Sequence, residues 1–215
     1  MTKPFIQNHH LNVIKNKGRH VQYCFHDIED ASVLQAVKGQ AADQVKQAFS
    51  ELKGEEAEVI DPLSDVKTSI EVEAFIGSIY PYVKPFPAVD HTQIKELFPN
   101  NKKMQLPNLE NTDFSYLTYL GWNDTGQRKK YMVYEFDGKL VGIEGRYTPP
   151  TQRNYCYFCN ELTPVHLVSI RTDETSTDNP DYYRSIGQYI CKDSDECNKN
   201  ITDVTALESF IQKVI

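Results

Sequence analysis

The sequence contains no run of apolar residues that approaches the ~20 needed for a membrane-spanning helix. Its first residues, Met1 to Phe5, also lack the apolar core and the small-residue cleavage site of a secretion signal. We therefore expect a cytoplasmic protein with no membrane contact. Positive charge is scarce too, because 23 Lys and Arg residues stand against 30 Asp and Glu, a net charge of −7. This balance argues against a general affinity for nucleic acid, which depends on basic side chains.

Motifs of catalysis are missing as well. The sequence has no nucleophile elbow and no glycine loop of the kind that binds phosphate. The histidines His9, His10 and His26 stand without a partner motif, and roles on the surface or in the core suffice for them. We therefore do not expect an enzyme. The length of 215 residues allows one large domain or two small ones.

Cysteine is limited to five residues, four of which fall into two pairs. In a reducing compartment, clustered cysteines are more often metal ligands than disulfide partners. The first pair is Cys156-x-x-Cys159, which one tight turn can direct at the same ion, and the second is Cys191 and Cys197. The fifth, Cys24, is interpreted as a small buried hydrophobic residue.

Four thiolates supply a closed tetrahedral shell for one zinc ion at ~2.3 Å per bond. Catalytic zinc sites instead have three protein ligands and leave a position open for water, so the pattern predicts structural zinc. Over residues 153–200 the expected order of turn, hairpin, strand end and helix is that of a treble-clef zinc finger. This region has few large aliphatic side chains, so we expect metal binding and folding to be coupled.

The first part of the chain, residues 1–86, is predicted to be a small antiparallel helical bundle. An apolar stripe at helical spacing runs from Val33 to Leu52, and a second runs from Val72 to Val83. Thr68 lies three residues before Glu71, which is the spacing of a capping box at a helix start. An earlier helix is expected over 5–14. Acidic residues predominate between positions 27 and 73, whereas basic residues cluster later, which also indicates two domains.

The second part, residues 87–215, is predicted to be a mixed α/β domain, which makes the whole chain α+β. A short helix should cover 92–98 with Asp90 as its cap, and a last helix should have Thr202 as its cap. The dipeptide Asp137-Gly138 favours a tight hairpin turn. The expected strands cover residues 115–120, 130–136, 140–146, 165–170 and 188–191.

Two segments around the cysteines, Tyr155–Asn160 and Gly187–Lys199, closely resemble the zinc region of FusB-type fusidic acid resistance proteins, the elongation factor G-binding family. Leu120–Asn123 followed by Arg128–Tyr131 resembles a second hallmark of that family. The resemblance implies a cytosolic, monomeric protein without enzymatic activity. Such a protein would bind the C-terminal domains of elongation factor G, reach the ribosome through that factor, and release it when fusidic acid has trapped it. It would protect the target without binding the drug.

The resemblance also implies a set of residues for the partner. Aromatic contact positions carry over to Tyr155, Tyr189 and Phe210, and a contact position that is basic in the family falls on Ile186. Arg184, nearby in the same loop, is the candidate replacement for that charge. The family's metal ligands carry over to all four cysteines.

The residues themselves leave two alternatives open. Phe210 lies at the edge of the apolar stripe of the last helix, so half exposure of its ring is expected. The rings of Tyr155, Tyr189 and Phe210 could instead all be packed in the core. Trp122 is expected to pack in the core. The basic cluster Arg128–Lys130, together with aromatics near the metal, supports an alternative function, a zinc-finger protein that binds ribosomal RNA. The cluster could instead be the solvent-exposed start of a strand with no binding role.

Overall fold

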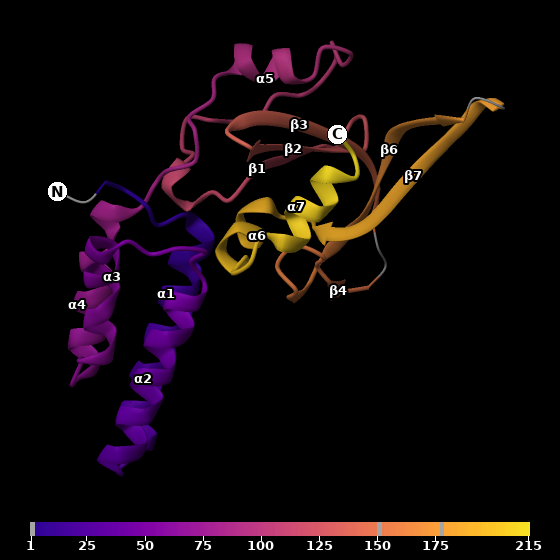
Figure 1. The fold of residues 1–215 in the computed structure, drawn as a ribbon. Helices are drawn as coiled ribbons and strands as arrows, with labels where there is room; N and C mark the ends of the chain where they lie inside the picture. Colours follow the sequence, from indigo (N-terminus) through magenta and orange to yellow (C-terminus); the bar gives the residue numbers. More distant parts are fainter. Residues whose placement is uncertain (1–2, 150–151, 177–178) are drawn as a thin grey trace. The chain divides into compact units, whose positions relative to one another are not determined.

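The computed structural model describes the backbone of residues 3–149, 152–176 and 179–215, and the side chains of these residues except those of 172–184. The chain divides into two compact units, Met1–Lys84 and Pro85–Ile215 (Figure 1). Helices make up the first unit, and an antiparallel sheet with flanking helices makes up the second. The architecture is therefore the predicted α+β class. Within the described residues, no helix combines the length and the apolar character that crossing a membrane requires.

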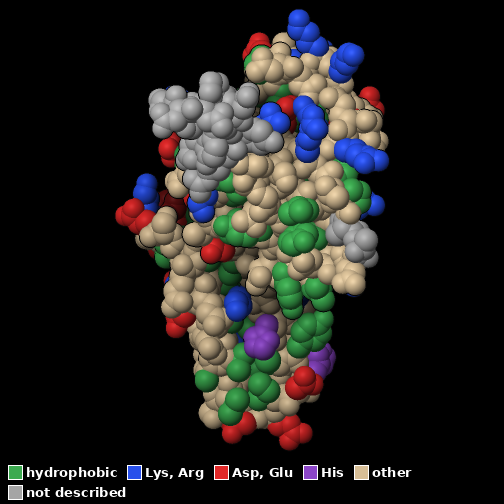
Figure 2. Space-filling model, turned by 90° about the vertical axis from the view of Figure 1, so that its right-hand side faces the viewer, with side chains coloured by type: hydrophobic (Ala, Val, Ile, Leu, Met, Phe, Trp, Pro, Cys, Tyr) green, Lys and Arg blue, Asp and Glu red, His purple; other side chains and the backbone are tan. Residues whose placement is uncertain are grey.

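The helical unit is organised around its first helix, which packs against both the second and the fourth. Its core is formed by aliphatic and aromatic side chains that include Leu11, Ile14, Val45 and Ile79. The helices are α1 (Asn8–Asp27), α2 (Ala31–Gln47), α3 (Gly54–Ile60) and α4 (Ser69–Ser78), with 3-10 helices at Asp61–Ser64 and Tyr80–Tyr82. Figure 2 shows hydrophobic side chains (green) and histidines (purple) at the surface of this unit, in the lower part of the view.

Local signals account for the starts of these helices. The Asp30 carboxylate accepts a 2.8 Å hydrogen bond from the amide of Ser32 at the start of α2. Thr68 caps α4 as predicted, because its hydroxyl accepts from the amide of Glu71 at 3.2 Å. The helix expected over 5–14 begins at Asn8 and continues to Asp27, and α3 was not predicted because seven residues show too little periodicity.

The second unit is built on a five-stranded antiparallel sheet with the order β1-β2-β3-β6-β7. A separate two-stranded hairpin, β4–β5, lies in the segment that connects β3 to β6. The strands are β1 (Leu120–Asp124), β2 (Lys129–Phe136), β3 (Lys139–Thr148), β4 (Asn154–Tyr155), β5 (Leu162–Thr163), β6 (Val165–Ser176) and β7 (Asn179–Cys191). The helices are α5 (His91–Leu97), α6 (Ser194–Asn200) and α7 (Thr205–Gln212), with a 3-10 helix at Phe114–Tyr116.

Two faces of this sheet carry different cores. On one face Phe98, which directly follows α5, packs with Trp122 and Tyr131, whose rings stack at 5.2 Å. The indole nitrogen of Trp122 donates to the carbonyl oxygen of Gln105 at 2.8 Å, so the predicted packing role of Trp122 is confirmed. The other face packs against α7 and the four clustered cysteines.

Several predicted boundaries in this unit are wrong. The strand expected over 115–120 is instead a 3-10 helix, which the Asp113 carboxylate caps, followed by a loop. The β1 strand begins only at Leu120 and extends to Asp124. Strands β6 and β7 are much longer than expected. The last helix begins at Thr205 with Val204, and not Thr202, as its N-cap residue, and the Asp203 carboxylate accepts from the amide of Thr205 at 2.9 Å.

Candidate metal centre and partner-binding residues

The first pair of cysteines lies on the turn that joins β4 to β5. The amide of Cys156 donates to the carbonyl of Glu161 at 3.0 Å, and the amide of Asn160 donates back to the carbonyl of Cys156 at 2.9 Å. Asn160 has a φ of 56°, a left-handed conformation that asparagine tolerates better than most residues. These bonds close the turn, so both Cys156 and Cys159 are held toward the same point.

The second pair comes from a strand end and a helix. Cys191 is the last residue of β7, and Cys197 lies in α6. The Asp193 carboxylate caps α6 by accepting from the amide of Asp195 at 2.8 Å. The amide of Cys191 also donates to the sulfur of Cys156 at 3.3 Å, so the backbone of one half of the site stabilises a ligand of the other.

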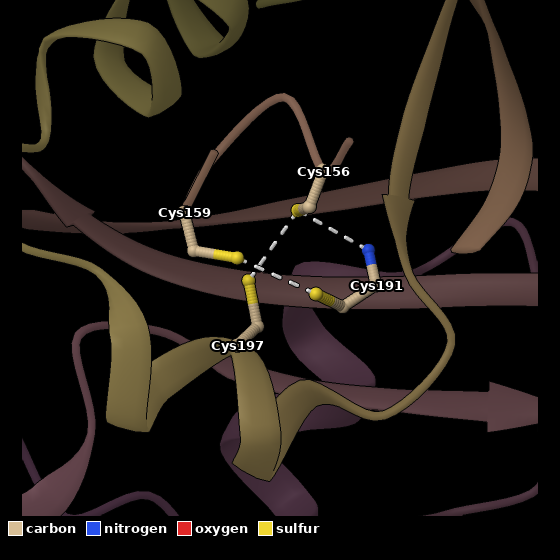
Figure 3. Close-up of side chains that lie close together, drawn as sticks. All are labelled: Cys156, Cys159, Cys191 and Cys197. Carbon is tan, nitrogen blue, oxygen red and sulfur yellow. Dashed lines mark hydrogen bonds between the residues drawn. The ribbon is translucent and has the colours of Figure 1, made fainter. Parts of the chain in front are cut away.

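The four sulfurs form a buried cluster in which all of them lie within 4.8 Å of one another (Figure 3). The Sγ atoms of Cys156 and Cys197 are 3.8 Å apart, and those of Cys159 and Cys191 are 3.6 Å apart. A regular tetrahedron with metal–sulfur bonds of ~2.3 Å has edges of ~3.8 Å. The donor set and its spacing therefore fit one zinc ion with no open position.

The four thiols share hydrogen bonds, so their acidities are linked. Hydrogen bonds from Cys159, Cys191 and Cys197 lower the pKa of the Cys156 thiol. The same sharing with Cys156 raises the pKa values of Cys191 and Cys197. Four neighbouring thiols therefore cannot all ionise by themselves. Zinc removes this conflict because it binds the thiolate form of each ligand, which couples metal binding to proton release.

Hydrogen bonds from the two residues that precede β1 hold α6 against the sheet. The side chain of Asn198 accepts from the amides of Thr118 and Tyr119 at 2.7 and 3.1 Å, and donates to the carbonyl of Tyr119 at 2.9 Å. The Tyr119 hydroxyl is buried and has no hydrogen-bond partner of normal geometry within the described part of the chain. Burial, and then the nearby Cys197 thiol, raise its pKa well above the usual value. A Cys197 thiolate would give this hydroxyl an acceptor.

The position of Lys130 differs most from what the sequence predicted. It was grouped with Arg128 and Lys129 as a basic surface, but its side chain is 0% exposed. Its Nζ donates to the Ser194 Oγ at 2.9 Å, and burial lowers its pKa to about 8. Strand alternation places Lys130 on the same face as Met132, and this pattern could have revealed its direction.

Comparisons with known proteins agree with this geometry. Residues 5–87 match the family model described as elongation factor G-binding protein, N-terminal, and residues 96–212 match the model described as FBP C-terminal treble-clef zinc-finger. The chain belongs to the FusB-type family of elongation factor G-binding proteins. Its four-cysteine site is accordingly the zinc site of a treble-clef finger.

A solved structure supports the same assignment. The fusidic acid resistance protein FusC superposes with a TM-score of 0.80 at 25% identity, over 99% of this chain and 98% of that chain. A comparison of this chain with curated protein sequences found no match. The two units of this elongation factor G-binding protein therefore occur together in FusC.

The structure divides the expected partner residues of this family member into exposed and buried ones. Tyr155 is 60% exposed and Tyr189 is 40% exposed, and Ile186 is half-buried against the core. The side chain of Arg184 lies outside the described residues. Phe210 is only 1% exposed, so the expectation of a half-exposed ring is wrong.

The burial of Phe210 has a clear cause in the zinc turn. Its ring packs edge-on against Phe158, with centroids 5.6 Å apart, and against Tyr157 at 6.4 Å. Both neighbours lie between Cys156 and Cys159, a segment far from α7 in the sequence. A helical wheel of α7 alone cannot show that this turn covers the edge of its apolar stripe.

Two exposed leucines were missed by the sequence analysis. Leu162 pairs with Tyr155 across the β4–β5 hairpin, and Leu167 pairs with Tyr189 across β6 and β7. Both leucines are exposed. We call Tyr155, Leu162, Leu167 and Tyr189 the tyrosine–leucine surface. A leucine in a predicted strand carries no signal of exposure, so only the register identifies these pairs.

Proposed function

We propose that this protein binds elongation factor G through its C-terminal unit and so releases the factor from ribosomes on which fusidic acid has trapped it. Membership in the elongation factor G-binding family supports the partner. The likeness to the fusidic acid resistance protein FusC supports the link to the drug. The observation that carries the proposal is the exposure of Tyr155 and Tyr189 beside the zinc ligands.

The zinc centre gives these tyrosines a rigid backbone. Tyr155 directly precedes the ligand Cys156, and Tyr189 lies two residues before the ligand Cys191. The amide of Tyr157 donates to the carbonyl of Tyr189 at 2.7 Å, which joins the two halves of the site. A rigid exposed aromatic loses little conformational entropy when a partner covers it, and such residues dominate binding energies. The tyrosine–leucine surface therefore has the properties of a binding hot spot.

Release of the factor follows from differential binding. A ligand shifts an equilibrium only when it binds one state more tightly than the other. The protein would bind the C-terminal domains of elongation factor G more tightly in the conformation found off the ribosome. It would act in the cytoplasm as a monomer, reach the ribosome through the factor and make no contact with the drug. The acidic helical unit would orient the complex or keep ribosomal RNA away.

The alternative of ribosomal RNA binding loses its main support. Of the basic cluster, Lys130 is buried, and the Lys129 ammonium forms a 2.7 Å ion pair with Glu144. Phosphate contacts need accessible basic side chains. Arg128 is the exposed member of the cluster, and one arginine contributes little affinity for a phosphate backbone, so this alternative is not proposed.

Binding is tested with purified elongation factor G, full-length and without its C-terminal domains. We expect retention of the full-length factor at micromolar protein and loss of binding to the truncated one. Tyr189→Ala should weaken binding by roughly 2 kcal/mol, about thirtyfold, as for a hot-spot residue. Tyr116→Ala is the matched control, because Tyr116 lies in the same unit and is 41% exposed. Unfolding curves of both variants should match the parent protein. Absence of retention, or an equal effect of the two variants, contradicts the proposal.

Release needs a separate measurement. Ribosomes carrying elongation factor G and fusidic acid are sedimented with and without the protein, and the factor is quantified in the supernatant. The parent protein should move the factor to the supernatant, and Tyr189→Ala should not. If the protein binds the free factor but leaves it on the ribosome, the binding step stands and the release step is refuted.

A further inference from the structure

We propose that Lys130 is the buried counter-charge of the zinc centre, and that its ammonium group compensates the negative charge of the four thiolates around the metal. A zinc ion with four thiolate ligands carries a net charge of −2. All four ligands of this site are buried. A buried charge is costly unless an opposite charge or a set of hydrogen bonds compensates it. The surrounding fold must therefore supply hydrogen bonds, such as the one from the Cys191 amide to the Cys156 sulfur, and positive charge.

Lys130 is placed to supply it. Its Nζ donates to the Oγ of Ser194 at 2.9 Å and lies 3.5 Å from the carbonyl of Lys192. These two acceptors lie between the ligands Cys191 and Cys197 in the sequence. The Asn123 side chain, which lies opposite Lys130 on β1, donates to the same carbonyl at 2.8 Å. The lysine therefore contacts the loop that carries the second pair of ligands.

The charge of Lys130 is not neutralised by its hydrogen-bond partners. Its three hydrogen-bond acceptors are a hydroxyl, an amide oxygen and a carbonyl, all of them neutral. Within the described residues it forms no ion pair with a carboxylate, whereas the adjacent Lys129 pairs with Glu144. Among the described side chains of this unit it is the buried cation, since Lys199 is exposed and pairs with Glu196. Three of the thiols, and after them the Asp193 carboxylate, favour the charged form of Lys130, which partly offsets its desolvation.

This placement has opposite consequences for the two states of the site. With zinc bound, the ammonium and the anionic centre stabilise each other in a region of low dielectric. Without zinc, the same ammonium is a buried cation whose counter-charge is missing. Lys130 should therefore strengthen zinc binding and at the same time make the metal-free unit less stable. A residue with a merely structural role would stabilise both states alike.

The test compares Lys130→Met with Lys129→Met, the same substitution one residue away on the other face of β2. Zinc affinity is measured by competition with a chelator, and stability by denaturant unfolding with zinc and with EDTA. For Lys130→Met we expect zinc affinity at least tenfold weaker, with the metal-free protein as stable as the parent or more so. Lys129→Met should bind zinc within twofold of the parent. Neither readout involves elongation factor G, so the result is independent of the proposed function.

A second variant separates charge from hydrogen bonding. Lys130→Gln keeps an amide donor for Ser194 but removes the charge, and it should lose zinc affinity as Lys130→Met does. It also serves as the test if Lys130→Met does not fold. Parent-like zinc affinity in either variant would overturn the proposal. The proposal would also be overturned if the two variants lost as much stability without zinc as with it, or if neither variant folded in either condition. The lysine would then be required irrespective of the metal.

Discussion

Gly121 of β1 lies so close to Ser194 of α6 that a β-carbon on the glycine would come within 2.5 Å of the Ser194 Oγ. The same Oγ accepts the 2.9 Å hydrogen bond of Lys130. Two residues after the glycine, Asn123 binds the carbonyl that follows Cys191. The segment Leu120–Asn123 therefore contacts the loop and helix that carry Cys191 and Cys197.

Gly121→Ala should consequently damage the site without touching a ligand. The added methyl group would also lie 2.6 Å from the ring of Tyr119, so β1 and α6 must separate. We expect a loss of ~1–3 kcal/mol in unfolding free energy, as for other overpacked cores, together with weaker zinc binding. Denaturant unfolding with zinc present measures the loss of unfolding free energy. The control is Gly126→Ala, whose new carbon meets its nearest neighbour at 3.4 Å and should change little. Equal stability of the two variants would contradict the role assigned to Gly121.

Removal of zinc should strongly lower the stability of the second unit and leave that of the helical unit unchanged, because the core of the helical unit contains none of the four ligands. The single tryptophan, Trp122, lies in the second unit and reports on it by fluorescence, while far-UV circular dichroism follows the helices. Cys159→Ser should reproduce the effect of a chelator and abolish zinc binding. Cys24→Ser, which changes the fifth cysteine, should retain one zinc per chain. A parent protein that contains no zinc would refute the assignment.

Phe210→Ala should act on stability and not directly on the partner. Truncating a large buried ring costs ~3–5 kcal/mol, so the second unit should unfold at much lower denaturant. Any loss of elongation factor G binding should then follow the unfolded fraction. In Tyr189→Ala, by contrast, binding should fall while stability stays unchanged. If Phe210→Ala folds like the parent but fails to bind, the ring acts as a contact after all.

Acid should weaken the helical unit through His10. Burial, and then the neighbouring His9, lower the pKa of His10 from 6.5 to about 3, and its ring stacks on Phe49 at 4.0 Å. The unfolded chain therefore takes up a proton first. The stability that neutral His10 contributes is complete above pH 6.5 and falls by about 1.4 kcal/mol per pH unit as pH drops toward 3.

The measurement is urea unfolding, followed by far-UV circular dichroism at pH 7 and pH 5. His10→Gln keeps an acceptor for the amide of Gln7, which donates to His10 at 3.3 Å, and should flatten the pH dependence. His26→Gln, at an exposed position of α1, should keep it. Identical slopes for the parent protein and His10→Gln would rule out His10 as the source.

Local signals were enough for much of the fold. The caps Thr68 and Asp90 were predicted from spacing, and both side chains accept hydrogen bonds from the amides of the following turn. The turn at Asp137-Gly138 has the left-handed φ values of 51° and 73° that its sequence indicated. The seven-residue helix α3 was not predicted, because so short a segment shows little periodicity and its N-cap residue, Lys53, is not a typical capping residue as Asp90 is.

The sequence by itself determined the metal ligands, because two cysteines on one tight turn and two more near a strand end leave zinc as the simplest chemistry for four clustered thiols. Only the tertiary structure decided which side chains face water. In that structure Phe210 is buried under the zinc turn, and Lys130 is buried against Ser194 of α6. Leu162 and Leu167 are exposed beside the two tyrosines. The physical reason is that exposure depends on segments far apart in the chain, such as β1 and α6, whereas ligand spacing and helix caps depend on near neighbours.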